Sequence, residues 1–256
     1  MRCVFQKKLS FIILCYSSFL LLSCNKTQPV SALTYGGSQN FKNKLVYLAK
    51  ITNHQPVKIA CEGTSLTYGQ NVPGVLPPIN NASQTRALYQ YPSSLQLTLQ
   101  TAGINANVIN RGFPGDRTTE GIIRWRDSVS ADVCIIEYGT NDAFNFGTYL
   151  SGPLTISAFT DNLNSIVKRR IDEGAWVIIT SPPDINPPDT ALNNYKKAIL
   201  AVAQKFDLPS FDVEKSVITS NADYFDGVHL TALAYQKWGV NIAPLLIINK
   251  FSHPLQ

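Results

Sequence analysis

The chain has 256 residues, of which 45% are hydrophobic and 15% are charged, and its formal net charge is +5. This composition excludes a disordered chain, a collagen-like repeat and a disulfide scaffold, because Gly and Pro number 15 each and Cys only 5. The 3 histidines, without CxxC or HxxxH spacing, argue against a multi-histidine metal cluster. The length suits a single α/β domain with a sizeable core.

The N-terminus has the features of a secretory signal. Three basic residues precede an apolar stretch over residues 9–22, which is followed by Ser23 and Cys24. A transmembrane helix, the alternative, would need roughly 20 apolar residues, more than this stretch offers. Residues 21–24 (LLSC) resemble the bacterial lipoprotein box, in which the cysteine is lipidated and becomes the new N-terminus. We therefore expect a lipoprotein signal peptide over 1–23 and a lipid anchor on Cys24, with ordinary secretion as the alternative.

Export places the remaining chain on the periplasmic or cell-surface side of a bacterial membrane. Removal of residues 1–23 takes away three basic residues and no acidic one, so the formal net charge falls from +5 to +2. No cluster of Lys and Arg remains, so we expect no nucleic-acid partner. Residues 24–40 are polar and contain the flexible run Gly36-Gly37-Ser38, which predicts a tether between the anchor and a domain over 41–256.

From residue 41 onward the chain alternates predicted helices and strands. Phe41, Leu45, Leu48 and Ile51 recur at helical spacing, which predicts an N-terminal helix over 41–52 docked on the domain. Short apolar runs predict five strands, over residues 57–61, 106–109, 132–138, 176–180 and 209–213. Further helices are predicted over residues 91–102, 119–129, 156–172 and 190–205, and from 231 onward.

Five short buried strands separated by helices indicate a parallel sheet that is covered on both faces. Cys61 and Cys134 fall inside two of these strands, and we expect them to be buried free thiols, with a disulfide as the alternative. In such sheets the binding crevice lies beyond the carboxyl ends of the strands. Candidate functional residues are therefore sought in the loops that follow the strands.

Three loops after predicted strands carry residues suited to acyl chemistry. The turn 63–69 contains Ser65, whose hydroxyl can be exposed by a tight turn. The turn is not a G-x-S-x-G elbow, because Thr67 stands where the second glycine of that motif would be. The turn 110–118 contains Gly115, where a backbone N–H can approach a ligand closely. The third turn, Gly139-Thr140-Asn141-Asp142, offers a side-chain N–H at Asn141. Each of these segments taken alone is also ordinary turn composition.

A fourth loop, Asp226-Gly227-Val228-His229, pairs a carboxylate with a histidine three residues later. A carboxylate at that spacing can hold the imidazole tautomer and stabilise the imidazolium as it forms. A structural or solvated histidine is the alternative for such a residue alone. Thr231 follows as a cap for the last helix.

In chain order these loops resemble the SGNH/GDSL hydrolase family, over about residues 57–239. The resemblance implies a three-layer α/β/α sandwich with a five-stranded parallel sheet, the flavodoxin-like fold of that family. It implies Ser65 as nucleophile, Asp226 and His229 as the acid–base pair, and an oxyanion hole formed by the N–H groups of Ser65 and Gly115 with the amide of Asn141. No metal or nucleotide cofactor is implied, and the sequence has no P-loop or zinc signature.

Two positions depart from the family pattern. Thr64 stands where the family has the aspartate of Gly-Asp-Ser, and Leu230 stands where a proline often follows the histidine. The aspartate is neither nucleophile nor base, so the change at Thr64 concerns the local support of the serine and not the chemistry.

The substrate is the least determined part of the sequence analysis. Phe144, Phe146 and Tyr149 follow Asn141 and either stack on a sugar ring or pack the loop itself. An exported enzyme meets polysaccharides and phospholipids rather than acyl-CoA, and no long apolar lid suggests a long-chain lipid. We therefore expect a small-molecule or polysaccharide ester, with removal of O-acetyl groups from a carbohydrate first. A lipase or lysophospholipase, an acyltransferase and a non-catalytic glycan-binding lipoprotein are the alternatives.

Overall fold

The computed structural model describes residues 37–71, 87, 89–144 and 152–247. Five strands form one sheet in the order β2-β1-β3-β4-β5, and every neighbouring pair is parallel. The strands are β1 (Val57–Gly63), β2 (Ala106–Gly112), β3 (Val133–Glu137), β4 (Trp176–Ser181) and β5 (Ser210–Asp212). All five coincide with apolar runs in the sequence, and the five-stranded parallel sheet of the sequence analysis is confirmed.

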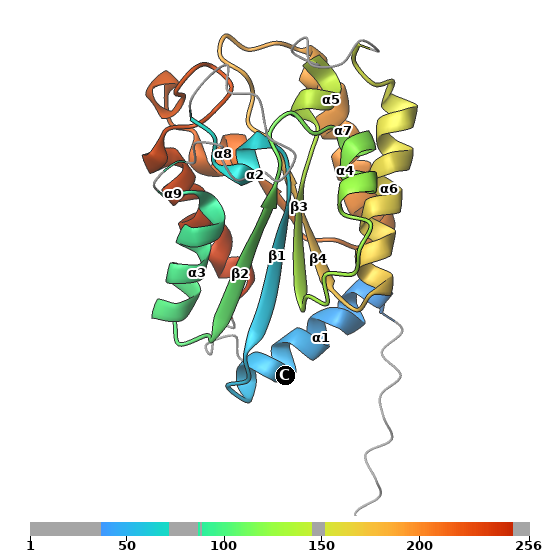
Figure 1. The fold of residues 1–256 in the computed structure, drawn as a ribbon, viewed down its shortest axis with the longest axis vertical. Helices are drawn as coiled ribbons and strands as arrows, with labels where there is room; N and C mark the ends of the chain where they lie inside the picture. The colour runs from blue at the N-terminus through green and yellow to red at the C-terminus, as the bar shows by residue number, and fades with distance from the viewer. Residues whose placement is uncertain (1–36, 72–86, 88, 145–151, 248–256) are drawn as a thin grey trace, which may run out of the picture. The chain divides into compact units, whose positions relative to one another are not determined.

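Helices cover both faces of the sheet, as Figure 1 shows for the domain. One face packs against α3 (Tyr91–Thr101), α8 (Val213–Val217) and α9 (Ala232–Ile242). The other face packs against α6 (Ile156–Asp172) and α7 (Ala191–Phe206), with α4 (Thr118–Arg124) beside α6. Each face has its own apolar core, which gives the three-layer α/β/α sandwich. No helix among the described residues is long and apolar enough to cross a membrane.

The two cysteines show how the strand register divides the cores. Cys61 pairs with Ile135 across the β1–β3 ladder, whereas Cys134 pairs with Ala60. Because successive residues of a strand point to opposite faces, the two thiols lie on opposite faces of the sheet. Both are buried and free. Burial raises the pKa of the Cys61 thiol to about 12, so it is not a nucleophile at neutral pH.

The N-terminal helix α1 (Gln39–Thr52) docks on the domain through polar as well as apolar residues, and the predicted Leu48 and Ile51 pack against the core. Its buried residues are Asn40, Asn43 and Tyr47, whereas Leu45 is 42% exposed. The Asn40 amide pairs with the backbone N–H and C=O of Val177, at 2.7 and 3.1 Å. The Asn43 amide donates to two backbone carbonyls, and the Tyr47 hydroxyl donates to a third. The helix therefore satisfies backbone groups near the sheet, in addition to its apolar contacts.

Candidate active site

Ser65 begins the short helix α2 (Ser65–Tyr68), directly after β1. Thr64 caps this helix by accepting a hydrogen bond from the backbone N–H of Leu66. The preceding Gly63 is required, because a Cβ there would lie 2.6 Å from the backbone oxygen of Glu137. A tight strand-to-helix turn thus holds the serine at the carboxyl end of the sheet, where the residue is 6% exposed.

A short loop between η1 (Asn221–Asp223) and α9 holds Asp226 and His229 together. One carboxylate oxygen of Asp226 accepts hydrogen bonds from the backbone N–H groups of Val228, at 3.0 Å, and His229, at 2.7 Å. Tyr224 and Leu230 form an antiparallel bridge that closes the loop. Leu230 is fully buried, which explains why an apolar residue can replace the proline of the family pattern.

The loop brings the imidazole of His229 between Asp226 and Ser65. Oδ2 of Asp226 lies 2.7 Å from Nδ1, and Nε2 lies 2.9 Å from the Ser65 hydroxyl oxygen. The carboxylate assigns the ring proton to Nδ1, which leaves the Nε2 lone pair facing the serine. Partial burial opposes ionisation of Asp226, but hydrogen bonds from His229 and Val228 outweigh it and lower the pKa to about 2. The carboxylate is therefore charged at neutral pH.

Gly115 lies in the turn that follows β2, and a hydrogen bond joins this turn to Asn141 after β3. Gly115 has a φ of +82°, a conformation that favours glycine. The side-chain amide of Asn141, on α5 (Thr140–Phe144), donates to the backbone oxygen of Asp116 at 2.9 Å. An amide NH₂ carries two N–H groups, so this bond also fixes the direction of the second. The N–H of Phe113 donates to the oxygen of Gly63 at 2.9 Å, which links the Gly115 turn to the serine turn.

Several buried ionisable residues that support these loops were not predicted from the sequence. Burial raises the pKa of both Asp116 and Asp142 to about 6, although Arg124 and Thr118 respectively oppose the shift by hydrogen bonding. These supporting residues are Glu137, Asp142, and Asp116 with Arg124. A carboxylate inside an apolar strand, as in the run 132–138, is a sequence signal that could have found Glu137.

The predicted substrate-binding residues are only partly described by the structure. Phe144 ends α5 and is half-buried against the core on the α6 and α7 face. Phe146, Tyr149 and the predicted lipidation site Cys24 lie outside the described residues.

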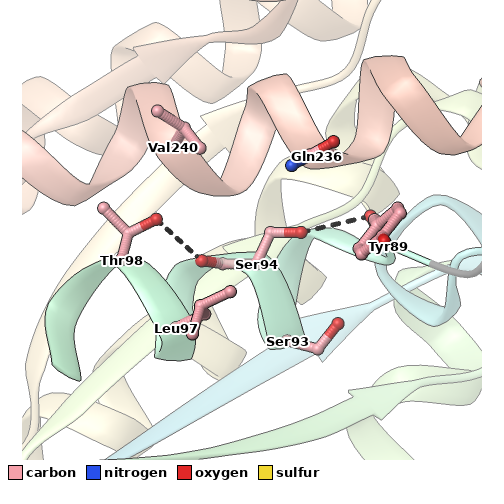
Figure 2. A pocket seen from close by; sticks show the side chains of 7 residues that line it. All are labelled: Tyr89, Ser93, Ser94, Leu97, Thr98, Gln236 and Val240. Carbon is pink, nitrogen blue, oxygen red and sulfur yellow. Dashed lines mark hydrogen bonds between the residues drawn. The ribbon is translucent and has the colours of Figure 1, made fainter. Parts of the chain in front are cut away.

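A separate hollow of about 260 Å³ lies between α3 and α9. Figure 2 shows Gln236 and Val240 of α9 on one side and Ser94, Leu97 and Thr98 of α3 on the other. The described residues that line it include no histidine and no carboxylate. The Ser94 hydroxyl donates to the backbone oxygen of Tyr89 rather than to a base. Among the described residues that line this hollow, no serine is paired with a histidine as Ser65 is.

Comparisons with known proteins identify the family and the fold. The family model described as GDSL-like lipase/acylhydrolase matches residues 61–237. An aryl esterase of M. smegmatis superposes with a TM-score of 0.58 at 20% identity, covering 74% of this chain and 98% of its own. A carbohydrate acetylesterase from Sinorhizobium meliloti gives a TM-score of 0.55 at 18% identity, over 74% and 98% of the two chains.

A catalytic variant of an acetylxylan esterase from Geobacillus stearothermophilus gives a TM-score of 0.59 at 16% identity, over 74% of this chain and 94% of that one. No curated protein sequence matches the chain significantly. At these identities the structural likeness shows the fold, and the family model, which spans most of the chain, shows the family. The chain belongs to the GDSL-like lipase/acylhydrolase family, the SGNH hydrolases, and is an ester hydrolase.

Proposed function

We propose that Ser65, His229 and Asp226 form the catalytic triad of this ester hydrolase and that the reaction passes through an acyl-enzyme. The observation that carries the proposal is the pair of hydrogen bonds through His229, 2.7 Å to Asp226 and 2.9 Å to Ser65. A nucleophile within hydrogen-bond reach of a base, which is itself oriented by a third group, is the arrangement that activates a serine.

The first half-reaction transfers the acyl group to the enzyme. Nε2 of His229 removes the hydroxyl proton of Ser65 as its Oγ attacks the ester carbonyl carbon. The N–H groups of Ser65 and Gly115 and the amide of Asn141 stabilise the oxyanion of the tetrahedral intermediate. The ester C–O bond then breaks, and the imidazolium of His229 gives its proton to the departing alcohol.

The second half-reaction restores the serine. His229 removes a proton from a water molecule, whose oxygen attacks the acyl carbon on Ser65. When this second intermediate collapses, the proton returns to Oγ and the carboxylic acid leaves. The charged carboxylate of Asp226 stabilises the imidazolium in both halves.

We further propose that the substrate is an O-acetylated carbohydrate. The proposal is supported by the named activities of two structures with the same fold, a carbohydrate acetylesterase and an acetylxylan esterase. It is also supported by the expected export of the chain, which would bring it to polysaccharides rather than to acyl-CoA.

Replacement of the serine tests the triad. Ser65→Ala should abolish hydrolysis of p-nitrophenyl acetate, because no acyl-enzyme can form. Ser93→Ala is the matched control: Ser93 is exposed on α3 and donates to the backbone oxygen of Gln90, so its loss should leave the rate unchanged. Wild-type activity in Ser65→Ala would refute the assignment.

A substrate panel separates the candidate reactions. The domain over 37–256 is incubated with acetylated xylan and with p-nitrophenyl esters of two to sixteen carbons, and acetate and acyl products are followed. Release of acetate from the polysaccharide supports the proposal. A preference for long chains indicates a lipase, acylated sugar acceptors indicate a transferase, and failure of an organophosphonate to label Ser65 indicates a non-catalytic binder.

We also propose that the enzyme is exported and anchored through a lipid on Cys24. The support is the basic and apolar pattern over residues 1–22 and the resemblance of residues 21–24 to a lipoprotein box. In a bacterial host the full chain should incorporate labelled palmitate and fractionate with membranes, whereas Cys24→Ala should do neither. Equal labelling of both would refute the anchor.

A further inference from the structure

The turn over Phe113–Asp116 carries one proposed oxyanion donor and orients another. Gly115 lies within the turn, and the backbone oxygen of Asp116 accepts the 2.9 Å hydrogen bond from the Asn141 amide. The N–H of Asp116 closes the turn by donating to the oxygen of Phe113 at 3.2 Å. A shift of this turn would therefore move the N–H of Gly115 and the amide of Asn141 together.

A single guanidinium contacts both ends of this turn. Arg124, the last residue of α4, donates from Nε to Oδ2 of Asp116 at 2.7 Å and from Nη2 to Oδ1 at 3.0 Å. Its Cζ lies 3.3 Å from the centroid of the Phe113 ring. The two-bond fork fixes the direction of the carboxylate as well as its distance. The stacking contact holds the other end of the turn.

Because Asp116 and Phe113 are buried, loss of their contact with Arg124 would disturb the turn. Asp116 is 1% exposed and Phe113 is 6% exposed, whereas the Arg124 side chain reaches solvent at 28%. Burial raises the pKa of Asp116 to about 6, and the hydrogen bonds and charge of Arg124 oppose this shift. Without the guanidinium, the carboxylate would have to take up a proton or turn toward water. Either response would displace the turn.

We propose that Arg124 is a positioning residue for the oxyanion hole. Through Asp116 and Phe113 it sets the donors at Gly115 and Asn141 for the tetrahedral intermediate. This inference rests on the proposed function, since it assigns the two donors their roles.

The kinetic signature follows from where the donors act. They stabilise the intermediate rather than the bound ester, so the loss falls on kcat and not on KM. Arg124→Gln should lower kcat for p-nitrophenyl acetate about 10- to 100-fold while KM stays within about threefold. Arg124→Lys, which keeps the charge but not the fork, should fall between this variant and the wild type. Asp116→Asn should resemble Arg124→Gln.

A double-mutant cycle separates positioning from general stability. In the Asn141→Ala background one of the two donors is already gone, so Arg124→Gln should lower kcat by a clearly smaller factor than in the wild type. A residue that only stabilises the fold would cause the same fold-loss in both backgrounds. That additive result, or an unchanged kcat in a folded Arg124→Gln variant, would overturn the inference.

The control is another partly exposed ion pair. Lys50→Gln breaks the 2.6 Å pair between α1 and Asp132, which involves no proposed site residue, and should leave kcat unchanged. Thermal unfolding establishes that each variant is folded; if Arg124→Gln is not, Arg124→Lys and Asp116→Asn carry the same test. Organophosphonate labelling of wild-type Ser65 distinguishes failure of the proposed triad from failure of the positioning role. If the wild type is not labelled, the triad is refuted. If the wild type is labelled but Arg124→Gln has an unchanged kcat, only the positioning role is refuted.

Discussion

The hydroxyl of Thr64 donates a 2.8 Å hydrogen bond to Oε2 of Glu137, which joins the serine turn after β1 to the end of β3. The backbone N–H of Thr64 and the hydroxyl of Thr67 donate to the same oxygen, each at 3.1 Å. Glu137 is fully buried, and burial raises its pKa against these three hydrogen bonds. The residue that departs from the family pattern is therefore matched to a buried acceptor.

An aspartate at position 64 should be poorly tolerated in this chain. Thr64→Asp would replace a donor with a second acceptor against the carboxylate of Glu137, so one of the two must hold a proton or move. We expect a loss of about 3 kcal/mol in the free energy of unfolding, measured by urea denaturation. Thr64→Ser, which keeps the hydroxyl, should stay within about 1 kcal/mol of the wild type. Equal stability of Thr64→Asp and Thr64→Ser would contradict the role of Glu137.

The loop that carries the histidine depends on a glycine. Gly227 has a φ of +87°, and a Cβ there would lie 2.3 Å from the backbone oxygen of Asn186. The Asn186 N–H donates to the oxygen of Gly227 at 2.7 Å, so the two loops cannot separate without losing this bond. Gly227→Ala should therefore displace the loop and lower kcat at least about 10-fold.

Gly103 is the matched control for this substitution. Its φ of +82° is nearly the same, but a Cβ there would meet nothing within 4 Å. Gly103→Ala should cost only the backbone strain, about 1–2 kcal/mol, and leave kcat unchanged. Similar kcat values for the two alanine variants, by steady-state hydrolysis of p-nitrophenyl acetate, would show that the contact with Asn186 does not position the loop.

The strands and the site loops were predictable because their signals are local. Buried strands of a parallel sheet are continuous apolar runs, and the site loops follow them or precede the last helix. The pair Asp226 and His229 was predictable because its members are only three positions apart in the chain. Ser65, which His229 contacts, lies 164 residues earlier in the chain, and only the resemblance to the family suggested this contact.

Features that depend on distant polar partners were not predictable. The face through which α1 docks is set by Asn40 and Asn43, whose backbone partners lie 128 to 167 residues away. Apolar spacing predicted the contacts of Leu48 and Ile51 with the core, but not the buried amides of Asn40 and Asn43. The same holds for Glu137, whose partners on the serine turn precede it by 70 and 73 residues.

The carboxylate of Asp226 is predicted to act by holding the histidine tautomer. Asp226→Asn would present an amide that can favour the other tautomer, with the proton on Nε2 facing the serine, so kcat should fall about 10³- to 10⁴-fold. Asp223→Asn is the control, because Asp223 bonds Thr219 and Lys237 rather than the histidine. Its kcat should stay within about threefold of the wild type. Comparable losses of kcat in the two variants would show that the effect is not specific to the tautomer.

Asp142 links the Asn141 loop to α4 and should make stability depend on pH. Its Oδ1 accepts hydrogen bonds from the backbone N–H and the hydroxyl of Thr118, at 2.9 and 2.7 Å. Within the described residues its Oδ2 has no hydrogen-bond partner. Burial raises its pKa to about 6, against the hydrogen bonds from Thr118.

Because this pKa is higher in the folded state than in the unfolded state, where it is about 3.9, the folded state takes up a proton as the pH falls through 6. The resulting stability is present at low pH and is lost as the pH rises through 6. Between pH 5 and pH 8 the wild type should therefore lose about 1 kcal/mol that Asp142→Asn does not lose, measured by urea denaturation at both pH values. Asp223→Asn should keep the wild-type change, because hydrogen bonds from Lys237 and Thr219 outweigh burial, lower the pKa of Asp223 to about 2 and keep it ionised throughout this range. If Asp142→Asn shows the same change as Asp223→Asn, Asp142 is not the group that takes up the proton.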